Sequence, residues 1–146
     1  MKTVDEVVVA LELRPHPEGG WFKETWRAPG RVETERGTRN HATGVLYLLG
    51  SGDESAWHRV HGSQELWIWQ DGGELLLRTG GFAETPGAEV QYRLGPASAG
   101  HEPQVMIQAG QWQAARVAVG DWVLVSCIVS PGFDFADWEM PGATTE

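Results

Sequence analysis

Residues 57–72 read WHRVHGSQELWIWQDG, and this stretch decides the fold. It places His58 and Glu65 on two short extended segments, 55–60 and 65–70, with a His-Gly-Ser turn between them. Successive side chains of a strand point to opposite faces, so both polar groups reach one interior if each strand turns that face inward. The stretch therefore predicts two strands of one sheet with an imidazole and a carboxyl group between its walls.

Further short strands are expected on both sides of this stretch. The polar, irregular residues 31–41 are expected to form a loop, and Asp71-Gly72-Gly73 is a strong signal for a hairpin turn. Many short strands without long helices between them favour an all-β sandwich or barrel over a parallel α/β sheet. The other expected strands are 21–27, 43–49, 74–79, 89–94, 104–108, 113–117 and 122–129.

One short helix is expected before the strands. Thr3 and Glu6 have the spacing of a capping box, and apolar residues then recur on one helical face. Pro15 requires the helix to end before it, because the residue preceding a proline avoids helical geometry. We expect a helix over about residues 3–12 and, from the chain length, a single domain over residues 1–146.

The composition excludes several classes of protein. A net charge of −9 and a pI near 4.9 disfavour binding to nucleic acid, which requires basic patches. No apolar run is long enough to span a membrane, and the acidic N-terminus is unlike a signal peptide, so a cytoplasmic protein is expected. The single cysteine, Cys127, lies in an apolar strand and is expected to be buried. The eight tryptophans suit either core packing or a stacking surface for a ring.

Residues 57–72 resemble the first sequence motif of the cupin superfamily, which has the form H-x-H, then three or four residues, E, six residues and G. His58, Glu65 and Gly72 match this motif, whereas Val60 stands at the second histidine. The second motif, P-x-G-x-x-H, is similar to residues 108–113. There only the glycine matches, and Gln113 replaces the histidine.

The resemblance therefore implies a cupin site that lacks two of its usual metal ligands. A divalent metal ion held by His58 and Glu65 is one alternative, because imidazole and carboxylate are good ligands for such ions. A catalytic metal usually has about three protein ligands. The candidates for a third ligand are Gln104, Gln113, His61 and His101.

A closer resemblance covers nearly the whole chain. PHPEGG at 15–20 and PGFDF at 131–135, with segments 57–59, 65–67, 103–105 and 109–112, are similar to the cupin-five family, a domain of unknown function grouped with the sugar-epimerase-like cupins. The resemblance implies a double-stranded β-helix, the jelly-roll barrel of cupins, and a homodimer. It does not settle the activity.

The hypothesis that follows is a small-molecule-binding protein whose pocket is centred on His58 and Glu65. These two residues are the candidate catalytic pair, and the ligand is expected to be a sugar nucleotide or a planar heterocycle. The candidate ligand-binding residues are Trp67, Trp69, Gln104, Trp112 and Gln113.

Other interpretations remain beside it. The resemblance to epimerases suggests that His58 acts as a base with its pKa raised by the carboxylate, although Tyr47 and Tyr92 match no motif for the tyrosine acid of those enzymes. The two buried groups could instead only satisfy each other in a non-catalytic sensor or structural dimer. At residues 15–20 a rigid turn is expected, or His16 and Glu18 close the pocket mouth. Phe133 and Asp134 either close the pocket or pack at its edge.

Overall fold

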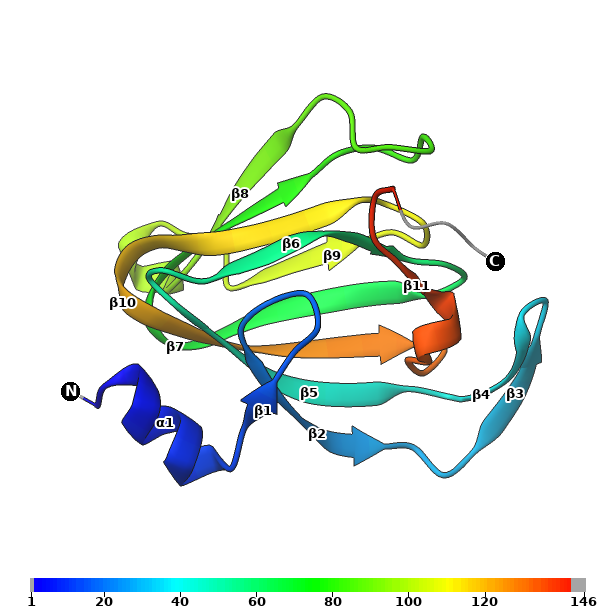
Figure 1. Cartoon of the computed structure of the whole chain (residues 1–146), viewed down its shortest axis with the longest axis horizontal. Coiled ribbons are helices and arrows are strands. Elements are labelled where there is room, and N and C mark those ends of the chain that lie inside the picture. The colour runs from blue at the N-terminus through cyan, green and yellow to red at the C-terminus, as the bar shows by residue number, and fades with distance from the viewer. Residues whose placement is uncertain (1, 143–146) are drawn as a thin grey trace.

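The computed structural model describes residues 2–142 and is a strongly curled antiparallel sheet with one short helix on its outside (Figure 1). The elements are α1 (Val4–Leu11), β1 (Arg14–Pro15), β2 (Trp21–Arg27), β3 (Arg31–Thr34), β4 (Gly37–Asn40), β5 (Thr43–Gly50), β6 (Glu54–Val60), β7 (Gln64–Thr79), β8 (Val90–Leu94), η1 (Ala97–Ala99), β9 (Gln104–Ile107), β10 (Gln113–Ser130), η2 (Phe135–Asp137) and β11 (Trp138–Glu139). The sheet is a half-barrel, so the predicted all-β fold with a short N-terminal helix is confirmed.

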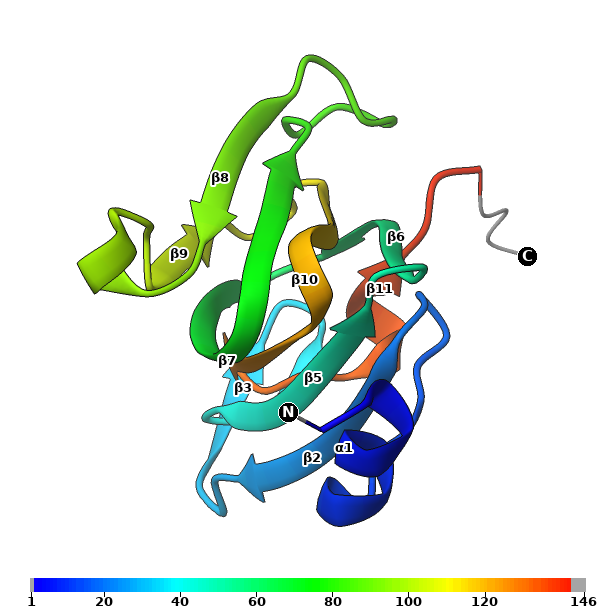
Figure 2. The ribbon, with the colours of Figure 1, turned by 90° about the vertical axis from the view of Figure 1, so that its left-hand side faces the viewer.

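Strand β10 organises the sheet. Its first half pairs with β6 and β7, and its second half pairs with β5 and β7. This register sets Gln113 of β10 opposite His58 of β6, and Val129 of β10 opposite Glu65 of β7. Figure 2 shows how β10 and β7 curl together so that their two halves belong to different walls. His58 and Glu65 thereby face one interior from strands that are both neighbours of β10.

The predicted hairpin at residues 71–73 is wrong. Strand β7 continues through these residues without a break, and its pairing with β10 shifts register there instead of ending. A Cβ atom on Gly73 would lie 1.8 Å from the carbonyl oxygen of Val119, so only glycine permits β10 to approach this closely. The glycines that suggested a reversal therefore serve a bend between two long paired strands.

Two apolar cores lie on opposite faces of the sheet. Alternation along β5 sends Leu48 outward beneath α1 and Tyr47 and Leu49 into the half-barrel. The helix begins at the predicted Thr3–Glu6 capping box, with both reciprocal hydrogen bonds present. No helix among residues 2–142 is long and apolar enough to cross a membrane.

The expected loop at residues 31–41 is also a misprediction, because these residues form the two-stranded hairpin β3–β4. Most of this hairpin is exposed, so it shows no alternation of apolar and polar residues that would mark it in the sequence. Its exception is Arg39, which is buried against Asp137 of η2. Arg39 donates to Asp137 at 2.9 Å through both Nε and Nη2, and Arg36 Nε adds a contact at 2.7 Å. We call these three residues the Asp137 clamp; it joins the hairpin to the C-terminal segment.

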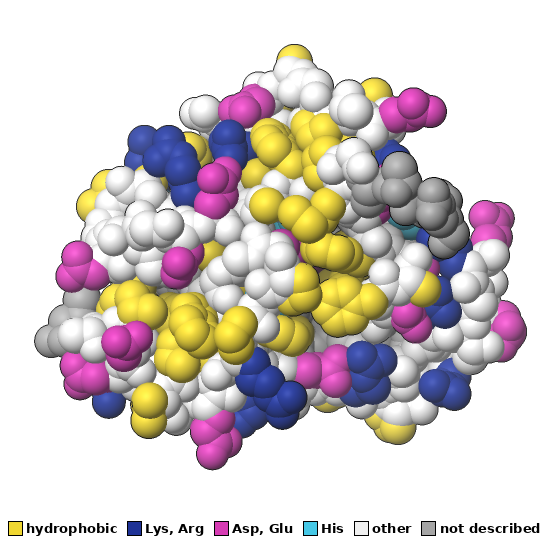
Figure 3. All heavy atoms as spheres, in the orientation of Figure 1, with side chains coloured by type: hydrophobic (Ala, Val, Ile, Leu, Met, Phe, Trp, Pro, Cys, Tyr) yellow, Lys and Arg dark blue, Asp and Glu magenta, His cyan; other side chains and the backbone are white. Residues whose placement is uncertain are grey.

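The surface has one pronounced feature in the orientation of Figure 1. Apolar side chains gather across the middle of this face, and acidic and basic side chains lie mostly around them (Figure 3). Exposed large apolar residues include Trp26, Phe82 and Phe135. On this face the basic side chains lie in small groups beside acidic ones and do not form a continuous basic patch.

Candidate functional site

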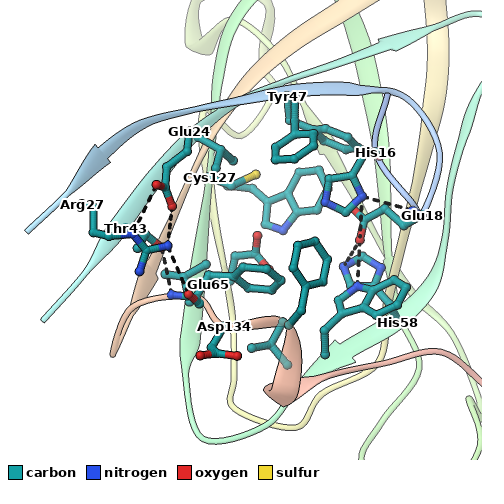
Figure 4. A pocket seen from close by; sticks show the side chains of 18 residues that line it. His16, Glu18, Glu24, Arg27, Thr43, Tyr47, His58, Glu65, Cys127 and Asp134 are labelled. Carbon is teal, nitrogen blue, oxygen red and sulfur yellow. Dashed lines mark hydrogen bonds and ion pairs between the residues drawn. The ribbon is translucent and has the colours of Figure 1, made fainter. Parts of the chain in front are cut away.

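A cavity of about 300 Å³ opens into the half-barrel. It is large enough for a small-molecule ligand. His58 and Glu65 both line it, together with His16 and Glu18 from the turn between β1 and β2 (Figure 4). The aromatic side chains that line it are Phe22, Tyr47, Trp67, Phe133, Phe135 and Trp138.

The carboxyl group that contacts His58 is Glu18 rather than Glu65. His58 Nε2 lies 3.1 Å from Glu18 Oε2, and Figure 4 shows this carboxyl group between the rings of His16 and His58. Glu18 is only 8% exposed and its Oε1 accepts a hydrogen bond from Ser55 at 3.1 Å. Trp138 donates to its Oε2 at 3.3 Å. The PHPEGG turn thus places a buried carboxyl group in the interior, and each of its two oxygens has a protein partner.

Glu18 and His58 are placed to share one proton. Nδ1 of His58 donates to the carbonyl oxygen of Ala56 at 2.8 Å, since a carbonyl can only accept, and a neutral imidazole then has no proton on Nε2. Burial raises the pKa of Glu18 and lowers the pKa of His58, so both effects favour the neutral pair in which the Glu18 carboxyl group donates to Nε2. The expected rise of the His58 pKa is wrong, because the cost of burying its charge outweighs the opposing attraction of Glu65.

Glu65 belongs to a second buried chain. Its Oε1 accepts a hydrogen bond from Gln113 Nε2 at 2.9 Å, and Gln113 Oε1 accepts one from Trp67 Nε1 at 2.7 Å. Glu65 is 9% exposed, and burial raises its pKa, with a smaller opposing effect of His58. Gln113, which replaces the histidine of the second cupin motif, therefore orients the carboxyl group and the indole instead of a metal.

The C-terminal segment forms the outer side of the cavity. Phe135 packs edge-on against both Phe133 and Trp138, with ring centroids 4.8 and 5.8 Å apart. The Asp137 clamp fixes this segment, because Asp137 lies between Phe135 and Trp138 and is 2% exposed. The neighbouring arginines lower the pKa of Asp137, Arg39 most strongly. Phe133 and Asp134 both line the cavity.

The rim holds the one arginine that lines the cavity. Arg27 donates to Glu24 at 2.6 Å through Nη2 and at 3.2 Å through Nε. Its Nη1 donates to Asn40 at 3.0 Å, and Nη2 also approaches the carbonyl oxygen of Phe133 at 3.4 Å. Each guanidinium nitrogen of Arg27 therefore already has a partner.

Four of the five residues expected to bind the ligand do not line the cavity. Gln104 is exposed on β9, because Val105 and Ile107 take the inward positions of that strand and reverse the expected alternation. Trp69 donates its indole N–H to the Gly73 carbonyl oxygen at 2.8 Å and packs at the edge of the inner core. Trp112 is buried beneath Arg59, whose guanidinium carbon lies 4.4 Å from its ring centroid. Trp67 lines the cavity, and Gln113 lies behind it.

The donor set does not fit a divalent metal. Among residues 2–142, no three histidine, cysteine or acidic side chains form a group that could hold an ion. The suggested additional ligands are engaged elsewhere: His61 contacts Glu139 at 2.8 Å, and His101 contacts Glu74 at 2.6 Å.

Sequence reasoning missed the contribution of Glu18 to the centre of the site. Its only signal was the PHPEGG turn, which also suggested a rigid corner or a pocket mouth. The sequence assigned no role to Tyr47. In the structure it lines the cavity, and its hydroxyl donates to the carbonyl oxygen of Gly19. Burial raises the pKa of Tyr47, so it stays protonated.

The curled sheet, its N-terminal helix and its inward polar groups define a protein of the cupin class. The chain belongs to the Cupin_5 family, described as Cupin superfamily (DUF985), which matches residues 5–141. It is 28% identical to the uncharacterized protein YML079W of Saccharomyces cerevisiae, over 92% of this chain and 73% of that protein.

Two solved structures share both sequence and fold with this chain. A hypothetical protein from Leishmania major is 30% identical, with a TM-score of 0.85 over 94% of this chain and 86% of that one. Protein SO0799 from Shewanella oneidensis is 28% identical, with a TM-score of 0.84 over 96% and 85%. These likenesses establish the cupin fold and the family, and their names state no ligand or reaction.

Proposed function

We propose that this protein binds a small molecule inside the half-barrel, against Glu18 and Glu65. The observation that carries the proposal is the convergence of two buried carboxyl groups on a cavity of about 300 Å³ whose other walls are largely aromatic. Burying an ionisable group is costly unless something compensates. A site that places two such groups beside open space, with apolar walls around them, has the composition of a ligand pocket.

The proposal is tested by blocking the cavity. Val45 lines the cavity, so Val45→Phe fills part of it, and Val32→Phe adds the same bulk on the exposed hairpin as a matched control. Metabolite pools are screened for compounds that raise the melting temperature. We expect shifts with the unmodified protein and with Val32→Phe, and none with Val45→Phe. Shifts of equal size in all three proteins would place binding elsewhere and contradict the proposal.

A second candidate function is proton transfer to and from the bound molecule, and the Glu18–His58 pair favours it. The proton between Glu18 Oε2 and His58 Nε2 can reside on either atom, and when it moves to His58 the Glu18 carboxylate becomes a base. Both nitrogens of His58 are already engaged by protein atoms, whereas Glu18 Oε1 accepts from Ser55 and has a second lone pair, so Glu18 is the member of the pair that can reach a ligand. In this candidate function, Glu18 exchanges the proton and His58 is a positioning residue, in contrast to the sequence interpretation of His58 as the base.

Proton exchange is measured directly in deuterium oxide. A panel of keto sugars and other carbon acids is incubated with the protein, and loss of the exchangeable carbon-bound proton is followed by NMR. Glu18→Gln keeps the shape and removes the acid, so exchange should fall about 100-fold or more. Wild-type exchange that survives in Glu18→Gln would exclude this role. Absence of wild-type exchange with every compound would reject the catalytic candidate and leave the binding proposal standing.

A further inference from the structure

We infer that the cavity takes a small organic cation, an amine or quaternary ammonium compound, and rejects anions such as phosphates and nucleotides. The inference rests on the proposed function, because it names the chemical class of the ligand for that same cavity. It is carried by three features of the lining: an absence of free positive charge, a carboxyl oxygen open to the cavity, and aromatic walls.

The cavity offers an anion no free cation. Arg27 is the only lysine or arginine among the lining residues, and its three guanidinium nitrogens already contact Glu24, Asn40 and the Phe133 carbonyl oxygen. A diphosphate entering here would meet Glu24 and Asp134 at the rim. A sugar nucleotide, one of the ligand classes expected from the sequence, is therefore disfavoured by electrostatic repulsion.

The histidines do not supply the missing charge. His58 donates through Nδ1 to Ala56 and shares one proton with Glu18 through Nε2. His16 Nδ1 accepts a hydrogen bond from the backbone N–H of Glu18 at 3.1 Å, so His16 is not the doubly protonated imidazolium ion. Burial lowers the pKa of both imidazoles, which keeps the two rings neutral near pH 7.

Glu65 provides the complementary acidic group: burial favours its protonated form in the free protein, and an ammonium group bound beside it would favour release of that proton. Its Oε1 is held by Gln113, no N–H or O–H group of the described residues donates to Oε2, and the buried Cys127 thiol, a weak donor, also hydrogen-bonds this carboxyl group. The side chain is about nine-tenths buried, yet it lines the cavity. A carboxyl group fixed by Gln113 and otherwise hydrogen-bonded only by a weak thiol donor can release its proton and pair with an ammonium group placed in the cavity.

The walls favour the same ligand. Phe22, Phe135 and Trp138 lie around the cavity with Tyr47 and Trp67, and aromatic faces attract a cation strongly when water is excluded. The chain as a whole carries a net charge of −9, which raises the local concentration of cations and lowers that of anions. The aromatic contacts and the net charge of the chain therefore both favour a cation over an anion.

The test uses three probes of one shape and different charge: choline, 3,3-dimethylbutan-1-ol and 3,3-dimethylbutanoate. Each has three methyl groups on a central atom, and they are respectively a cation, a neutral alcohol and an anion. Binding is followed by NMR through the indole N–H signals of Trp67 and Trp138, which line the cavity. The indole of Trp122, which donates to the Lys2 carbonyl oxygen beneath the helix, is the internal control.

We expect choline to shift the two cavity indoles with an affinity at least about tenfold higher than that of the alcohol. The anion should shift neither. Glu65→Gln should reduce the preference for choline over the alcohol to about threefold or less, because the amide keeps the shape but has no acidic proton to release when the cation binds. Glu84→Gln, on the exposed loop after β7, should leave that preference unchanged.

The outcomes separate this inference from the proposed function. Equal affinity for choline and the alcohol, with shifts at the cavity indoles, would overturn the cation inference and support binding in the cavity. Tighter binding of the anion would also overturn it. A choline titration that shifts neither cavity indole signal would contradict the inference. If none of the three probes shifts these signals and the metabolite screen also finds no ligand, the proposed function is contradicted as well.

Discussion

At the scale of single residues, Gln113 is the side chain on which the two inner polar groups depend. Its amide accepts from the Trp67 indole at 2.7 Å and donates to Glu65 at 2.9 Å, and it is 1% exposed. Gln113→Met preserves the volume but leaves both partners without a hydrogen bond. We expect a loss of about 2–5 kcal/mol in the free energy of unfolding, since each unsatisfied buried group costs about 1–3 kcal/mol.

Urea unfolding of Gln113→Met measures this loss, and Gln91→Met, at an exposed position of β8, is the matched control. The control should change the free energy of unfolding by less than about 0.5 kcal/mol. If both variants unfold at the same urea concentration, the hydrogen bonds of Gln113 to Glu65 and Trp67 do not stabilise the fold.

The residues of the site differ in how far the sequence could reveal them. His58 and Glu65 were predictable, because strand alternation within one short stretch sends both inward. Glu18 was not, since it lies outside regular structure and reaches His58 only when the β1–β2 turn folds over the sheet. Gln104 was assigned to the wrong face, although alternation of the apolar Val105 and Ile107 predicts that these two residues point inward and Gln104 outward, as the structure has them.

At the scale of elements, the bend in β7 also depends on a long-range contact that the local sequence does not reveal. Asp71-Gly72-Gly73 has the composition of a hairpin turn, and only the close approach of β10 reveals that these glycines serve a bend. Gly73→Ala would place its Cβ 1.8 Å from the Val119 carbonyl oxygen. We expect it to cost at least about 3 kcal/mol, the upper end for overpacking, by thermal or urea unfolding.

Gly52→Ala is the control for this substitution, since no atom lies within 4 Å of a Cβ at that exposed position. It should change the free energy of unfolding by less than about 0.5 kcal/mol. Equal stabilities for the two alanine variants would mean that β10 does not approach β7 closely at Gly73.

The Asp137 clamp makes a separate prediction about the outer side of the cavity. Asp137→Asn leaves the buried Arg39 without its carboxylate, so we expect a loss of about 3–5 kcal/mol in the free energy of unfolding. Because the clamp joins η2 to the β3–β4 hairpin, amide hydrogen exchange should also rise over residues 133–139.

Glu139→Gln is the matched control for the clamp, because Glu139 lies in the same segment and pairs with Arg59 and His61 at 28% exposure. A partly exposed pair contributes no more than about 1 kcal/mol, so exchange over residues 133–139 should change little. Similar exchange in both variants would show that Asp137 does not hold the segment.

At the scale of the whole molecule, the buried groups of the cavity oppose one another as pH changes. The pKa values of Glu18 and Glu65 are raised by burial, so the folded chain keeps protons that the unfolded chain loses above the ordinary carboxyl pKa of 4.5. Their contribution to stability therefore falls as pH rises from that value. The pKa values of His16 and His58 are lowered from 6.5, so their contribution falls as pH drops below 6.5.

The histidine contributions are shared by two proteins that differ only at Glu65, so the difference between their stabilities isolates one carboxyl contribution. Glu65→Gln removes this contribution, so the free energy of unfolding of the variant should rise relative to that of the wild type as pH increases. The slope is at most about 1.4 kcal/mol per pH unit while the folded carboxyl stays protonated. Urea unfolding of both proteins at pH 6.5, 7.0 and 7.5 measures this difference, with Glu84→Gln as an exposed control that should show no slope. A difference that stays flat or falls with pH would mean that Glu65 is already ionised in the folded protein without a bound cation.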